Sequence, residues 1–192
     1  MPSLRIRSWK TLNRRNCGSQ IVEFGAALGL LIACVFLPMI DLSIVPVRWM
    51  MAQEIINAYS RQLAFCETFS QSYRTMEADP SLTTRLTNLG GIKVKSIQLY
   101  LRITRIAHNN ETLVVEMPKR IPPEWLPNGS KSPCSYSLVL NVQSLLSPAV
   151  LFPGGGDLLP GVTAPFPMSI SASHEWENFG KNPVTGKFFL NE

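Results

Sequence analysis

The sequence predicts an α+β protein in which one long N-terminal helix, first transmembrane and then amphipathic, packs on a small antiparallel β-sheet. A single uncharged apolar run lies near the N-terminus. The stretch after it keeps apolar residues at helical spacings of three and four, and most of the remainder alternates with period two. We expect four parts: a basic leader (1–18), a transmembrane helix (19–47), its amphipathic continuation (48–78) and an exported β-rich domain (79–192).

The net positive charge of the chain is concentrated in the leader. The formal charge is +5, and the five cations before Gly18 are accompanied by no acidic residue: Arg5, Arg7, Lys10, Arg14 and Arg15. In the rest of the chain, Lys and Arg equal the 13 Asp and Glu in number. A basic tract beside an apolar span is typical of the cytoplasmic flank of a membrane segment. Nucleic-acid binding would need cations on a folded face among aromatic residues, so we expect no nucleic-acid partner.

The apolar run extends from Phe24 to Ile40 without a charge. As a helix it would be about 25 Å long, and residues 42–47 extend it enough to cross a hydrocarbon core. The cations before the run predict a cytoplasmic N-terminus and an exported C-terminal part. Pro38 and Pro46 each remove a helical hydrogen bond, so we expect a kink near the outer interface.

Glu23 stands at the start of this apolar run, where a carboxylate is costly and usually functional. If the bond after Gly18 is cut, Ser19 becomes the N-terminus and Glu23 the fifth residue of the mature chain. The carboxylate could then neutralise an α-ammonium group, its own or that of a neighbour. At about 4 Å such a pair is worth on the order of 4 kcal/mol before desolvation. The alternative is an interfacial glutamate that only marks where the span begins.

Gly18, four further residues and then Glu23-Phe24 opening an apolar helix resemble the processing site of type IV prepilins. With the short basic leader, the pattern is most similar to TadE-like minor pilins, or pseudopilins, of tight-adherence (Flp-type) pilus systems. The resemblance implies cleavage between Gly18 and Ser19, with Glu23 as the assembly carboxylate, in a subunit that assembles or primes an adhesive pilus.

The same resemblance implies partners and a location. The implied partners are a prepilin peptidase, other pilin or pseudopilin subunits and the inner-membrane assembly platform. The implied location is the bacterial inner membrane, with a cytoplasmic N-terminus and a periplasmic C-terminal domain, before any incorporation into an extracellular filament.

Two alternatives to this interpretation are open at the level of sequence. The chain could remain uncut as a single-pass, membrane-tethered binding module of another envelope complex. It could also be a lipoprotein, because residues 31–34 resemble a lipoprotein signal box that would make Cys34 a lipidated N-terminus. The apolar run continues beyond Cys34, however, and Glu23 would lie inside the short apolar region of such a signal.

The exported part is predicted from its spacing. Apolar residues at helical spacing continue to about Tyr73, and Asp79-Pro80 ends this region. A β-bulge is expected near Ser96, because Ile92 and Val94 have the opposite parity to the strand that follows. The predicted strands, separated by a turn at 108–111 and by two Pro-rich loops (117–133 and 147–167), are Ile97–Thr104, Thr112–Met117, Ser135–Leu145 and Phe166–Ala172.

No motif in the sequence meets the requirements of an active site. The two histidines, His108 and His174, lack metal-ligand partners at i+3 or i+4. The run Gly154–Gly156 is not followed by the Lys-Ser/Thr of a phosphate loop. We therefore expect no enzymatic activity, no metal and no cofactor. An oxidising periplasm would permit a disulfide between Cys66 and Cys134, with two reduced thiols as the alternative.

Overall fold

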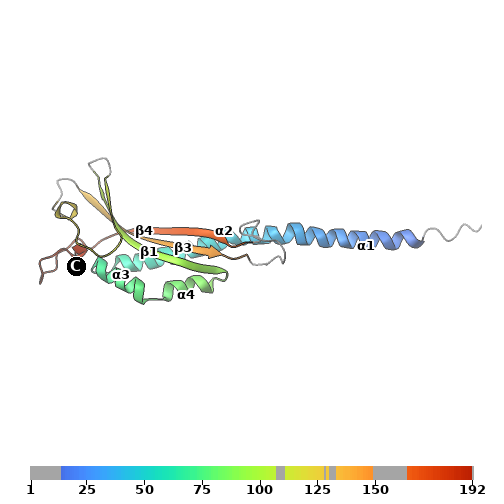
Figure 1. The fold of residues 1–192 in the computed structure, drawn as a ribbon, viewed down its shortest axis with the longest axis horizontal. Helices are drawn as coiled ribbons and strands as arrows, with labels where there is room; N and C mark the ends of the chain where they lie inside the picture. Colours follow the sequence, from blue (N-terminus) through green and yellow to red (C-terminus); the bar gives the residue numbers. More distant parts are fainter. Residues whose placement is uncertain (1–13, 107–110, 128, 130–132, 149–163, 192) are drawn as a thin grey trace, which may run out of the picture.

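The computed structural model describes residues 14–106, 111–127, 129, 133–148 and 164–191, with side chains from residue 20 onward. It contains one long helix near the N-terminus and a four-stranded antiparallel sheet, so the predicted α+β arrangement is confirmed. The helix projects far beyond the domain that holds the sheet (Figure 1). The leader up to residue 13, the turn residues 108–110 and the run Gly154–Gly156 lie outside the described residues.

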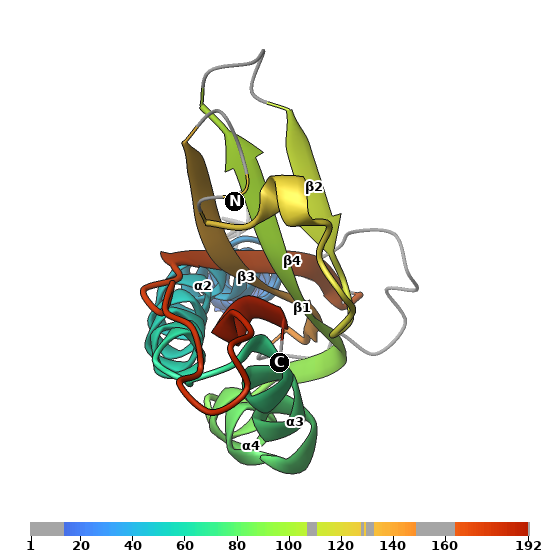
Figure 2. The same ribbon diagram turned by 90° about the vertical axis from the view of Figure 1, so that its left-hand side faces the viewer.

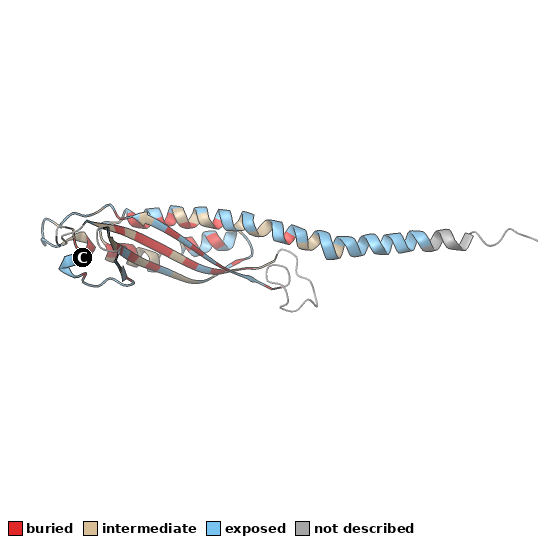
Figure 3. Ribbon diagram, turned by 90° about the horizontal axis from the view of Figure 1, so that it is seen from above, coloured by how far each residue is buried: buried red, intermediate tan, exposed pale blue. Residues whose placement is uncertain are grey.

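The long helix continues through both of its prolines. It comprises α1 (Arg14–Leu31), a π-helical turn (Ile32–Phe36) and α2 (Leu37–Ala64). The π-helical turn directly precedes Pro38 and shifts the hydrogen-bond register, which accommodates the missing N–H. Pro46 lies inside α2. Figures 1 and 3 show a gently curved rod instead of the kink that the two prolines predicted.

The expected amphipathic helix over 48–78 is interrupted. It ends at Ala64, and a new helix, α3 (Phe69–Ala78), begins after a short turn. The side chain of Thr68 caps α3 by accepting a hydrogen bond from the N–H of Gln71 at 3.1 Å. This cap satisfies an N–H that has no partner within the helix, and it fixes the new helix direction.

A further helix, α4 (Ser81–Asn88), was not predicted from the sequence. The carboxylate of Asp79 accepts hydrogen bonds from the N–H and the hydroxyl of Ser81 at 2.9 and 2.6 Å. The segment after Asp79-Pro80 thus forms a helix before the first strand begins.

The four strands form one antiparallel sheet in the order β2-β1-β3-β4. The register between β1 and β3 shifts between Val94 and Ser96, which confirms the predicted bulge. The second strand ends two residues before the predicted Met117, and the other predicted strands lie within observed ones. The strands are β1 (Ile92–Arg105), β2 (Thr112–Val115), β3 (Cys134–Leu146) and β4 (Phe166–Glu175).

The core lies between one face of this sheet and the helices. α2 packs mainly against β4 and also touches β3, while α3 and α4 contact β1, so the three helices share one face (Figure 2). Alternate strand residues such as Leu101, Leu138 and Ile170 are buried there against Ile56 and Leu86. The opposite face carries Ser, Thr, Asn and Gln at most of its positions. This one-sided pattern explains why the strands were predictable from period-two alternation.

Candidate functional site

The long helix exposes apolar side chains on all sides where it leaves the domain. We call residues 20–51 the apolar rod. Every residue from 20 to 32 is exposed, and Ile21 and Phe24 retain 73% and 70% of their accessible surface. Burying one such side chain is worth about 1.5–3 kcal/mol. The rod therefore requires a covering of lipid or protein that the domain does not supply (Figure 3).

The length of this helix fits a membrane. From Gln20 to Ala64 it contains 45 residues, and it is the one helix in the described part of the chain that is long and apolar enough to cross a bilayer, by length and composition. At about 1.5 Å per residue, the rod alone is about 48 Å long, which exceeds the hydrocarbon thickness. The remainder of the helix lies on the sheet and anchors the rod to the domain.

The residues singled out by the sequence motif lie within two neighbouring turns at the start of the rod. Gly18 and Ser19 belong to α1, and Glu23 and Phe24 are exposed one turn later. Positions 19 and 23 are related by i,i+4, so they lie on the same side of the helix. A carboxylate at 23 is therefore on the same side of the helix as any amine created at 19, and it lies at the exposed surface of the helix.

Asp41 is a second carboxylate in the rod, and it directly follows the uncharged apolar run that ends at Ile40. It is 2% exposed, although Ile40 and Leu42 on either side are exposed. The sequence pattern did not predict this burial. The carboxylate itself was the one signal in the sequence. An acidic residue next to an apolar run is costly to bury unless it is paired, so it marks a position that needs a structural explanation.

Arg48 fixes the point where the rod enters the domain. Its Nη1 donates to the carbonyl oxygen of Ser147, just beyond the end of β3, at 3.1 Å. Gly91, before β1, lies directly against the same guanidinium: a Cβ on Gly91 would be 2.7 Å from Nη1. Gly91 O also accepts a hydrogen bond from Ser147 N at 2.6 Å. The helix and two strand ends are thereby joined at one place.

The cysteines do not form a bridge in the structure. Cys66 and Cys134 are separate, half-buried thiols, at the end of α2 and the start of β3 respectively. The disulfide that an oxidising compartment would permit is therefore not formed here. Cys34 is exposed on the apolar rod, in the π-helical turn.

The described residues hold no group of three or more His, Cys, Asp or Glu side chains placed to bind a metal. His174 is placed by a contact of 3.1 Å between its Nε2 and Asn57 O, which ties β4 to α2.

Burial, assisted by the nearby Asp79 carboxylate, raises the pKa of Tyr59 to about 12. Burial likewise raises the pKa of Tyr136, whose hydroxyl donates to Trp125 O at 2.9 Å. Both phenols are neutral at physiological pH and belong to the core.

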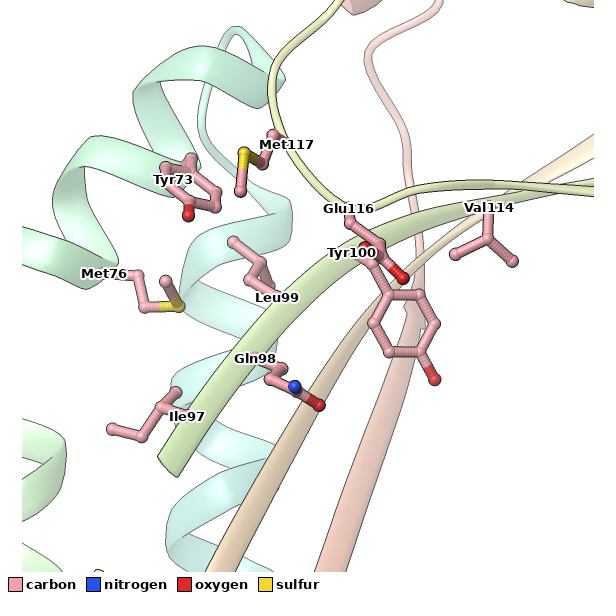
Figure 4. Close-up of a pocket in the computed structure, with 9 residues that line it drawn as sticks. All are labelled: Tyr73, Met76, Ile97, Gln98, Leu99, Tyr100, Val114, Glu116 and Met117. Atoms are coloured by element: carbon pink, nitrogen blue, oxygen red, sulfur yellow. The ribbon is translucent and has the colours of Figure 1, made fainter. Parts of the chain in front are cut away.

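One groove of about 410 Å³ lies between α3, β1 and the end of β2. Figure 4 shows Tyr73, Met76 and Met117 around the gap between α3 and β1, with Gln98 and Tyr100 on the other side of the strand. The groove holds no arrangement of nucleophile and base. Its lining is apolar apart from Tyr and Gln side chains and the carboxylate of Glu116.

No protein-family model, characterised protein or solved structure matches the chain significantly.

Proposed function

We propose that this chain is a minor pilin or pseudopilin that is cut after Gly18 by a prepilin peptidase and then assembles or primes an adhesive pilus. The observation that carries the proposal is the apolar rod, in which every residue from 20 to 32 is exposed, with the cleavage glycine and Glu23 in adjacent turns at its start. The rod is attached to a compact α+β domain, and the described residues hold no group of three or more His, Cys, Asp or Glu placed to bind a metal.

In this proposal the rod has two successive environments. Before assembly it lies in the inner membrane, with the basic leader on the cytoplasmic side and the domain in the periplasm. After cleavage it leaves the lipid and packs against the rods of other subunits. Exposure on every side suits both states, because lipid and a bundle of helices each cover the whole circumference.

Glu23 supports the packing of the cleaved rod against the rods of other subunits. Cleavage leaves an ammonium group at Ser19, and a charge of either sign is costly in a helix bundle unless it is paired. Glu23 lies on the same side of the helix as Ser19, and it is exposed to a neighbouring rod. The carboxylate thus meets an amine of its own subunit or of the next one, which fixes the axial register between them.

Substitution of Glu23 tests this role. In cells that have the peptidase and the assembly machine, Glu23→Gln should be cut as efficiently as the unmodified chain but should enter pili poorly. Loss of a pair worth more than about 1.4 kcal/mol predicts a reduction of tenfold or more in assembled subunit. Glu54→Gln, at an exposed glutamate on the domain part of α2, is the matched control. Pilus output from Glu23→Gln equal to that of the control would contradict the assembly role.

A second candidate is an uncut, membrane-tethered binding module, and the groove beside β1 favours it. That module would keep its leader whether or not the peptidase is present. The pilin proposal requires a peptidase-dependent change in mass, so the two are distinguished by the N-terminus of the protein recovered from the membrane.

A further inference from the structure

The edge of the sheet formed by β1 is only partly paired. β1 has 14 residues, whereas β2 has four and pairs only with Leu101–Thr104. Arg105 N donates to Glu111 O at 3.0 Å on this side. In an antiparallel ladder alternate residues share a direction, so Ile97 and Leu99 also direct their N–H and C=O groups to this side. They lie beyond the last β2 pair, and the described residues supply no hydrogen-bond partner for them there.

Of these two residues, Leu99 is buried and Ile97 is half-buried. Leu99 is 3% exposed, and a buried backbone group without a partner costs about 1–3 kcal/mol. The next ladder position on the β2 side would belong to Met117, but the chain has left the strand after Val115. An added strand would provide the missing partners.

The groove of Figure 4 runs along this same stretch of β1. Tyr73 and Met76 of α3 and the nearby Met117 line it on the α3 side of β1, and Val114 lies across the strand. Val114 and Met117 are exposed apolar residues. The only charged side chain in the lining is that of Glu116. The groove therefore offers apolar contacts beside the open backbone groups, and one negative charge at its β2 end.

The opposite edge of the sheet is covered. Gln53 of α2 donates through Nε2 to Ser171 O on the outer side of β4 at 3.2 Å. His174 of β4 contacts Asn57 O of the same helix at 3.1 Å. Within the described residues, the stretch of β1 beyond its pairing with β2 is therefore the place where open backbone groups lie beside an apolar groove.

We propose that the β1 edge at Ile97 and Leu99 binds an extended segment of another protein, which adds as a strand beside β1. The bound segment places apolar side chains at alternate positions in the groove and a Lys or Arg beside Glu116. Backbone hydrogen bonds provide affinity, and the alternate side chains and the cation provide specificity, as in other cases of strand addition.

A two-fold pair of this chain, with both rods in one membrane, does not fit the edge. Two copies anchored by their rods in one membrane have β1 running in the same direction. A two-fold axis along that direction places each outward N–H opposite the same N–H of the partner, so the ladder cannot form. This step alone rests on the proposed membrane anchorage.

Amide hydrogen exchange on the full-length protein in detergent micelles tests the proposal. The probe is a short synthetic peptide of alternating valine and threonine with one lysine. In the free protein, the amides of Ile97 and Leu99 should exchange faster than those of Gln98 and Tyr100, which face β3. The peptide should slow exchange at Ile97 and Leu99 and leave their neighbours unchanged. A peptide with proline at its central positions lacks the donors and should give no protection.

Charge variants test the predicted cation. Glu116→Gln should weaken binding of the lysine peptide by about two- to fivefold, as expected for a partly exposed ion pair. Glu54→Gln, on the far side of the domain, should not.

Three results would overturn the proposal: equal exchange rates at all four amides in the free protein, peptide binding without protection at Ile97 and Leu99, or protection that increases with protein concentration alone. The experiment does not depend on cleavage at Gly18, so its failure leaves the pilin proposal standing.

Discussion

Gly90 and Gly91 have the same backbone conformation, but only Gly91 lies against the Arg48 guanidinium. Comparing substitutions at the two positions therefore measures the effect of that contact. Both have φ of +75°, where a side chain is strained by about 1–2 kcal/mol. An added Cβ on Gly90 would meet nothing within 4 Å, whereas on Gly91 it would be 2.7 Å from Arg48 Nη1 and 3.1 Å from Ser147 O. Gly91→Ala should therefore lower the free energy of unfolding more than Gly90→Ala does. Urea unfolding monitored by circular dichroism measures both, and equal losses would show that the Arg48 contact does not constrain Gly91.

The carboxylate of Asp79 makes the start of α4 sensitive to pH. Its hydrogen bonds to the hydroxyl and N–H of Ser81 lower the pKa of Asp79 below its ordinary 3.8. Because the folded state favours the charged form, the stabilisation is complete at neutral pH and is lost as the pH falls through the folded pKa. Asp79→Ala should lower the melting temperature by a constant amount between pH 5 and 8, and the difference should shrink below about pH 4. A difference that is independent of pH down to 3 would contradict this role.

Among single residues, the sequence predicted the relative positions of those that lie close together along the chain. Gly18, Ser19, Glu23 and Phe24 occupy neighbouring helical turns, as their spacing required. The burial of Asp41 was not predicted from the sequence.

Among the elements, the apolar rod has the clearest measurable consequence. Leu30 is exposed within the stretch where every residue is exposed. Arginine at the middle of a membrane-spanning helix costs about 2.5–3.5 kcal/mol. Leu30→Arg should therefore shift protein from the membrane fraction to the soluble or degraded fraction, and Gln62→Arg, at an exposed position in the domain, should not. Separation after carbonate extraction measures this, and unchanged retention of Leu30→Arg would argue against a spanning helix.

Strands were easier to predict than helix ends. Pro133 and Pro148 flank β3, Pro165 directly precedes β4, and apolar residues alternate within both strands. Their predicted boundaries are therefore close to those observed. The break after Ala64 was missed because Leu63, Cys66 and Phe69 keep a helical spacing across it. The cap at Thr68 with Gln71 three residues later was a usable local signal. The sequence contained no local signal for the open edge of β1, because that edge depends on where β2 ends relative to β1.

The whole molecule is a compact domain on a long apolar rod, and the proposed function depends on one covalent event. Intact-mass analysis of the protein recovered from membranes of cells with a prepilin peptidase tests it most directly. The account predicts a chain that begins at Ser19, and full-length protein in a matched strain without the peptidase. A chain that retains residues 1–18 in both strains, or one that begins at a lipidated Cys34, would contradict it.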